Sequence, residues 1–145
     1  MRIRIAAVGK VKNSAAKELI DDYAGRLKHY CSLDIVEVKD SNPAEEGRRL
    51  LEKCETKNGS IFIIALSEEG KNYSSGELAA ALGRLNKDAA FLIGGPYGLS
   101  EEVKKKANLV LSLSRMTFTH EMARALLSEQ VYRAFTILKG EKYHK

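Results

Sequence analysis

The sequence predicts an α/β fold in which a mostly parallel β-sheet is covered by helices on both faces. Five short apolar runs alternate with five amphipathic segments, giving the order β-α-β-α-β-α-β-α-β-α. The runs consist largely of Val, Ile, Leu and Phe, as is typical of parallel strands buried on both faces. With 145 residues and no linker, internal repeat or low-complexity segment, we expect a single domain over residues 1–145.

The first two strands are expected at residues 3–8 and 34–38. Between them, apolar side chains recur at helical spacing, namely Ala16, Leu19, Ile20, Tyr23 and Leu27. A second helix should begin with Asn42 as N-cap and Pro43 at the first helical position. Its apolar side would consist of Leu50, Leu51 and Cys54.

The third strand is expected at residues 61–66, and the pair Ser74 and Glu77 predicts a capping box at the start of a third helix. The inner face of this helix would carry Leu78, Leu82 and Leu85.

The last two strands are expected at residues 89–93 and 109–113, with a short helix capped by Ser100 between them. The final helix should begin at Thr119 or His120. Its apolar stripe would be Leu127, Val131, Ala134 or Phe135, and Leu138.

The composition narrows the class of protein. Apolar residues make up 44% and charged residues 30%, which is ordinary for a soluble globular domain, and no run approaches the roughly 18 apolar residues of a membrane span. The apolar N-terminal run is too short for a signal peptide, so we expect a first strand there. Cys31 and Cys54 match no metal spacing and are expected to be reduced. The net charge of +5 permits an anionic partner such as RNA without requiring one.

Two strand ends carry the candidate ligand site. Residues 92–100 place Gly94, Gly95, Pro96 and Gly98 between a strand and a helix, and residues 113–118 follow the next strand. Because carboxyl ends of parallel strands meet at one edge of a sheet, we expect a ligand crevice there. The glycines do not form the dinucleotide fingerprint, and the sequence has no phosphate-binding P-loop. A tight structural turn and a binding loop both remain open for them.

The C-terminal segment is equally open to two interpretations. Glu129 and Arg133 lie four residues apart, which suits an ordinary ion pair on a helix. Histidine is a residue type suited to proton transfer, which makes His120 and His144 candidates for chemistry, but a terminal segment such as residues 143–145 is by default frayed. Connection rules favour a Rossmann-like topology without a knot.

Over essentially its whole length the chain resembles the SPOUT-superfamily methyltransferases that methylate N3 of a pseudouridine in large-subunit (23S) ribosomal RNA. The resemblance rests on residues 5–10, 92–96 with Gly98, 112–114 with 116–118, 129–134 and 143–145, whose combination in this order is highly specific. One departure is Thr119, where the family usually has proline and where threonine can still cap the helix.

The resemblance implies a cytoplasmic homodimer that uses S-adenosyl-L-methionine (SAM). The residues themselves show no cluster with metal-ligand spacing and no membrane span, so we expect neither a metal nor a membrane partner. The resemblance also implies a SPOUT fold with a C-terminal trefoil knot in place of the unknotted connection. The implied cofactor contacts are Leu66, Gly94, Leu113, Ser114, Arg115, Met116, Thr117 and Phe118. The implied substrate-side residues are His120, Glu129, Arg133, Tyr143 and His144.

The chemistry of pseudouridine suits these residue types. Its N3 is a weakly acidic imide nitrogen that attacks only as its proton leaves, and a positioned base contributes about 10²–10⁴-fold. His120, His144 and Glu129 are candidate bases, while Arg133 could stabilise the developing charge or hold a phosphate. We expect residues 143–145 to fold over the site of their own chain or of a partner, and their deletion to cost little stability.

The sequence also predicts what the substrate is like. Because the chain shows no separate RNA-binding module, we expect a large, shaped substrate such as the assembled subunit or ribosome. Two alternatives remain: a non-catalytic RNA-binding factor on the same fold, and a nicotinamide enzyme with a degenerate fingerprint.

Overall fold

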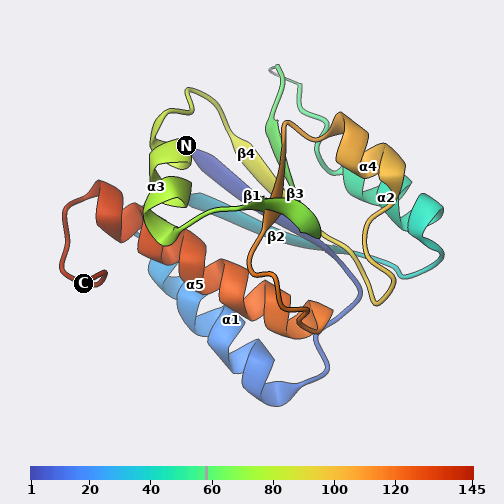
Figure 1. Ribbon diagram of the computed structural model, residues 1–145, viewed down its shortest axis with the longest axis horizontal. Helices are drawn as coiled ribbons and strands as arrows, with labels where there is room; N and C mark the ends of the chain where they lie inside the picture. The colour runs from blue at the N-terminus through green and yellow to red at the C-terminus, as the bar shows by residue number, and fades with distance from the viewer. Residues whose placement is uncertain (58) are drawn as a thin grey trace.

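The sheet is entirely parallel and has the strand order β2-β1-β4-β3-β5 in the computed structural model, which describes residues 1–57 and 59–145 (Figure 1). Its strands are β1 (Arg2–Val8), β2 (Ser32–Val38), β3 (Phe62–Asn72), β4 (Ala89–Ile93) and β5 (Leu109–Ser112). The helices between and after them are α1 (Ser14–Leu27), α2 (Pro43–Glu52), α3 (Ser75–Gly83), α4 (Glu101–Lys106) and α5 (His120–Leu138). The predicted α/β class and element order are therefore confirmed.

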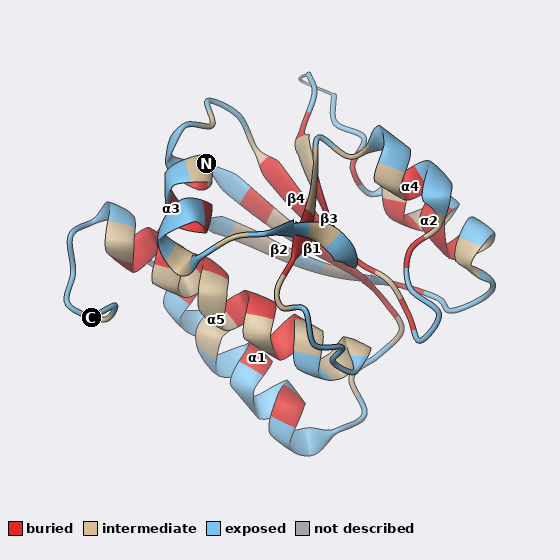
Figure 2. Cartoon of the chain, viewed as in Figure 1, coloured by how far each residue is buried: buried red, intermediate tan, exposed pale blue. Residues whose placement is uncertain are grey.

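Helices cover both faces of the sheet. α1, α3 and α5 pack together on one face, and α2 and α4 pack on the other (Figure 1). Because side chains alternate along a strand, Ile3 and Ile5 of β1 enter the core beneath α5, whereas Ala6 and Val8 enter the core beneath α2. Figure 2 shows the buried residues concentrated on the strands and on the inner sides of these helices.

Side-chain caps start the helices. The predicted caps Asn42, Ser74 and Ser100 are confirmed, and Ser74 forms the complete capping box with Glu77. Thr119 is the N-cap of α5, since its hydroxyl accepts the Met122 backbone N–H at 3.2 Å. The fold therefore starts α5 at His120 with threonine in the place of proline.

The third strand is longer than predicted. The pairing of β3 with β5 shifts register between Leu66 and Lys71, so residues 67–70 bulge and the strand then resumes to Asn72. A Cβ at Gly70 would lie 2.5 Å from the Val110 carbonyl oxygen, so only glycine fits where the two strands cross. The sequence did not predict this continuation because residues 67–72 are polar and strands were predicted from apolar runs.

Two predicted core positions are wrong. Leu19 is 44% exposed because the inner side of α1 is formed by Ala16, Ile20 and Leu27. Leu138 is 45% exposed because α5 ends there, with only part of the side chain covering Gly83. The rest of the stripe, including Leu127 and Val131, is fully buried.

The remaining expectations concern cysteines, membrane and topology. Cys54 is buried, which raises the pKa of its thiol to about 11, and both cysteines are free.

Within the described residues no helix has both the length and the apolar character needed to span a bilayer. Likewise, no group of three or more His, Cys, Asp or Glu side chains in that part of the chain could hold a metal ion. The trefoil knot stays a prediction, which the element order does not test.

Candidate functional site

A cleft of about 780 Å³ opens at the carboxyl ends of β3, β4 and β5. This is the edge at which open parallel sheets bind ligands, and the volume falls within the usual range of about 300–1,000 Å³. Its walls come from the end of β3, the β4–α4 loop, the β5–α5 loop and the first turn of α5. The residues that line it and that the sequence singled out are Leu66, Gly94, Leu113, Ser114, Met116, Thr117, Phe118 and His120.

The glycine loop after β4 is a compact turn that forms one wall. Gly98 has a φ of +78° and donates its N–H to the Gly95 carbonyl at 3.0 Å. A Cβ at Gly94 would lie 2.6 Å from the Gly98 carbonyl carbon and 2.9 Å from the Leu99 nitrogen. The turn itself therefore requires glycine at position 94, which confirms the tight structural turn that the sequence left open. The same turn also lines the cleft.

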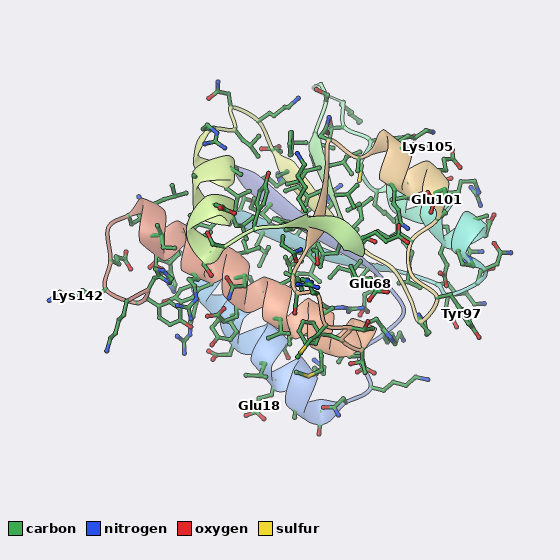
Figure 3. All side chains as sticks on the ribbon, in the orientation of Figure 1. Glu18, Glu68, Tyr97, Glu101, Lys105 and Lys142 are labelled. Carbon is green, nitrogen blue, oxygen red and sulfur yellow. The ribbon has the colours of Figure 1, made fainter. Side chains whose placement is uncertain are left out.

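The β5–α5 loop is held by its own polar side chains. Ser112 Oγ donates to the Ser114 carbonyl at 2.7 Å, and Ser114 Oγ accepts the Met116 N–H at 3.0 Å. The Thr117 hydroxyl donates to the Glu68 carboxylate, which connects this loop to the bulge of β3. Glu68, labelled in Figure 3, thus extends from β3 towards the loop before α5.

Arg115 differs from its neighbours on this loop. It is exposed, and it is not among the described residues that line the cleft. The structure therefore brings together every implied cofactor contact except the Arg115 side chain.

The lining combines an apolar floor with a largely acidic rim. Ile93, Leu66, Leu111 and Leu113 supply the floor. Carboxylates of Glu68, Glu69 and Glu121 lie on the rim, where Lys104 bonds Glu69 at 3.0 Å. This pairing with Glu69 raises the pKa of Lys104. Such a cleft suits a ligand that combines an aromatic ring with a positive charge.

A second group of implied site residues lies at the other end of α5. Arg133 donates to Glu129 Oε1 from Nε at 2.9 Å and from Nη2 at 2.5 Å. The Tyr143 hydroxyl donates to the same oxygen at 3.0 Å, and its ring lies 4.7 Å from the Arg133 guanidinium carbon. His144 Nδ1 lies 3.1 Å from Arg133 Nη1. We call Glu129, Arg133, Tyr143 and His144 the tail cluster.

Hydrogen bonds define what the tail cluster can do. Glu129 Oε1 accepts three bonds, and its Oε2 accepts a fourth from Gln130 Nε2 at 2.9 Å, so this carboxylate is saturated with donors. Burial and the bonds to Tyr23 and Glu129 raise the pKa of Tyr143, so its hydroxyl remains a donor at neutral pH. An arginine can only donate, so His144 Nδ1 accepts and a neutral ring carries its hydrogen on Nε2.

The cleft and the tail cluster are separate within one chain. His120 and Arg133 lie thirteen residues apart on α5, which at 1.5 Å per residue is about 20 Å. Figure 3 likewise shows Lys142, next to the tail cluster, on the opposite side of the molecule from Tyr97, which lines the cleft. The tail is packed rather than frayed, but it does not cover the cleft of its own chain.

One charged residue beside the cleft, Arg124, was not predicted from the sequence. Arg124 is 2% exposed, and its guanidinium bonds Glu37 at 2.5 Å. The available signal was its spacing: position 124 lies three and seven residues before Leu127 and Val131, on the apolar stripe of α5. A charged residue on such a stripe indicates a buried polar interaction.

Comparisons with known proteins find similarity to methyltransferases. A family model described as a predicted SPOUT methyltransferase matches residues 1–144. The ribosomal RNA large subunit methyltransferase H of Coprothermobacter proteolyticus is 45% identical, and that of Carboxydothermus hydrogenoformans is 44% identical, each alignment covering 100% of both chains. Among solved structures, one described as a probable methylase family protein from Haemophilus influenzae aligns with a TM-score of 0.59 at 17% identity. The alignment covers 99% of this chain and 70% of the other chain, and it supports the fold alone.

Proposed function

The chain belongs to the SPOUT methyltransferase family, and from this membership we propose that it methylates N3 of a pseudouridine in large-subunit (23S) ribosomal RNA, with SAM as methyl donor. The observation that carries the proposal is the cleft at the ends of β3, β4 and β5, in a chain whose full-length relatives are named as large-subunit ribosomal RNA methyltransferases. Family membership also favours methyl transfer over a non-catalytic RNA-binding role. We place the reaction in the cytoplasm, on the assembled subunit or ribosome.

The cleft residues fit the proposed cofactor. SAM, when bound, supplies an electrophilic methyl group on a positively charged sulfonium. The apolar floor around Leu66 and Leu113 would hold its aromatic base, and Glu68 provides a carboxylate for its positive charge. The turn at Gly94 and the loop of residues 113–118 complete the proposed contacts, with Arg115 taking part only through that loop.

The tail cluster supplies the groups that the target base needs. Arg133 would stabilise the negative charge that develops as N3 loses its proton, and Tyr143 would donate a hydrogen bond. Glu129 would hold both of these side chains in place, since its oxygens are already occupied by donors. That leaves His120 and His144 as the better candidates for the base.

The separation of cleft and tail cluster supports a homodimer. A two-fold axis that brings the tail cluster of one protomer to the cleft of its partner would join all the proposed site residues. Leu19 of α1 and Met122 of α5 are 44% and 43% exposed, which offers apolar surface for such contact. Two protomers, each with a net charge of +5, would also span more anionic RNA surface than one.

A binding measurement tests the cofactor. Ala123 is half-buried on α5 and lines the cleft, so Ala123→Phe would fill the space without changing the backbone. Ala81→Phe, at a half-buried position of α3 outside the cleft lining, is the matched control. Calorimetry should show SAM binding to the parent and the control, and none to Ala123→Phe. Binding of NAD in place of SAM would contradict the proposal.

A mixing experiment tests the shared site. Ala123→Phe keeps an intact tail cluster, and a chain lacking residues 143–145 keeps an intact cleft. If each site combines two protomers, the inactive variants mixed after unfolding and refolding should recover about a quarter of the parent activity, because half the dimers are mixed and half their sites are complete. The substrate is large subunits lacking the modification, with isotope-labelled SAM. A mixture without activity, from folded dimers, would exclude a shared site.

A further inference from the structure

One wall of the cleft is built from two segments that are far apart in sequence. Asn13 and Ala16 come from the start of α1, and His120 to Ala123 come from the first turn of α5. α1 and α5 pack against each other along the same face of the sheet (Figure 1). The position of His120 therefore depends on how the start of α5 is joined to residues 9–13, the loop that leads into α1.

The first connection runs through Arg124. Its Nη2 donates to the Gly9 carbonyl at 3.0 Å and to the Val8 carbonyl at 3.4 Å, while its Nη1 bonds Glu37 of β2. The Gly9 φ of +78° sets the direction of the chain at this point, where the Gly9 N–H also bonds the Val38 carbonyl at 2.8 Å. One planar guanidinium thus joins α5 to the ends of two strands, which a lysine could not reproduce.

The second connection runs through Glu121. Its Oε2 accepts the backbone N–H groups of Lys12 and Asn13, each at 2.8 Å. Asn13 in turn caps α1 by accepting the Ala16 N–H at 3.0 Å. The loop of residues 9–13 is therefore held by α5 at both ends, through carbonyls at the start and through N–H groups at the finish.

A buried arginine is a costly way to gain stability alone, because desolvation of the charge offsets most of the attraction. We propose that Arg124 and Glu121 are positioning residues that clamp residues 9–13 to the start of α5 and so fix the wall of the cleft that carries His120. The inference rests on the proposed function for the identity of the ligand, whereas the clamp itself rests on the contacts above.

The chain offers a matched control on the same two strands, β1 and β2, but on the face of the sheet that α2 covers. Arg4 also bonds a carboxylate of β2, Asp34, at 2.9 Å and a backbone carbonyl, that of Lys53, at 2.6 Å. In both arginines the Nε atom is buried without a partner among the described residues. Arg4→Lys and Arg124→Lys therefore each disturb bonds from a guanidinium to a β2 carboxylate and to a backbone carbonyl, and only Arg124 lies beside the cleft.

Three measurements on the full-length variants test the clamp: thermal unfolding, SAM binding by calorimetry, and hydrogen exchange of the Lys12 and Asn13 amides. Both variants should lose similar stability. Only Arg124→Lys should weaken SAM binding, by about tenfold for one lost hydrogen bond, and speed amide exchange in residues 9–13. Parent affinity and parent exchange in Arg124→Lys, despite its lower stability, would overturn the inference.

Glu121 variants provide an independent test should Arg124→Lys fail to fold. Glu121→Ala removes both acceptor bonds, whereas Glu121→Gln keeps an amide oxygen that can accept. Exchange of the Lys12 and Asn13 amides should be fastest in Glu121→Ala and intermediate in Glu121→Gln. Equal exchange in all three proteins would overturn the clamp. Absence of SAM binding by the parent would instead refute the proposed cofactor, and the exchange result would still decide the clamp.

Discussion

Removal of the Tyr143 hydroxyl should abolish most methyl transfer while leaving the cleft intact. In Tyr143→Phe the bonds to Glu129 and Tyr23 are lost, but the ring keeps its edge-on contact with Tyr132, with centroids 4.8 Å apart. The loss of these two bonds at a half-exposed position costs about 1–3 kcal/mol. If the hydroxyl donates to the target base, the rate should fall about 10²-fold or more at unchanged SAM affinity.

Deletion of residues 143–145 should cost more stability than the sequence predicts. Besides the Glu129 bond, it removes the Tyr132 contact and the stacking of Arg133 on the ring. Together these contacts are worth about 2–4 kcal/mol. The melting temperature should therefore fall by roughly 5–12 °C.

A second tyrosine provides the control for the first prediction. Tyr30 donates to Glu141 at 2.6 Å, which raises the pKa of Tyr30 to about 12, so Tyr30→Phe also removes a phenol–carboxylate bond near the end of α5. Unfolding, SAM binding and transfer of labelled methyl groups are measured on both variants. Transfer by Tyr143→Phe at the rate of Tyr30→Phe would refute a functional tail cluster.

Three further predictions follow from the fold. Backbone N–H bonds from Asn13 and Lys12 lower the pKa of Glu121 in the folded protein. The ionised carboxylate therefore stabilises the fold fully above its unfolded pKa of about 4.3, and this contribution is lost as the pH falls through the lower pKa of the folded state. Denaturant titrations should show the difference in unfolding free energy between the parent and Glu121→Gln shrinking below about pH 4. Leu127→Ala should cost about 2–5 kcal/mol of unfolding free energy, because the side chain is 0% exposed. Gly94→Ala should lower the melting temperature and SAM affinity together because its Cβ meets backbone atoms, and unaltered unfolding would contradict the tight turn.

The sequence predicted the fold well because its signals are local. Apolar runs identify strands, and Asn42, Ser74 and Ser100 identify helix starts through bonds made within three residues. The end of β3 was missed because its exposed residues pair with β5 after a bulge, and neither the pairing nor the crossing at Gly70 has an apolar pattern.

The strand-end part of the candidate site could be expected from the sequence, whereas the separation of the cleft from the tail cluster could not. Residues 113–118 and Gly94 were expected near one another because strand ends meet at one edge, and all of them except Arg115 line the same cleft. The distance between His120 and the tail cluster depends on the length and packing of α5, which a motif does not encode. Arg124 was missed because a charge on an apolar stripe identifies its partners only once the strands are in place.

The nineteen residues of α5 fix the distance between the cleft and the tail cluster. Its first turn belongs to the cleft and its last turns to the tail cluster, so the number of residues between them sets both a spacing and a rotation. One inserted residue would displace the cluster by about 1.5 Å and turn it by about 100° around the helix axis. If one site is shared between two protomers, as proposed, exposed positions of this helix can therefore change in side chain but not in number, and the length of the helix becomes as much a determinant of that site as any side chain that it carries.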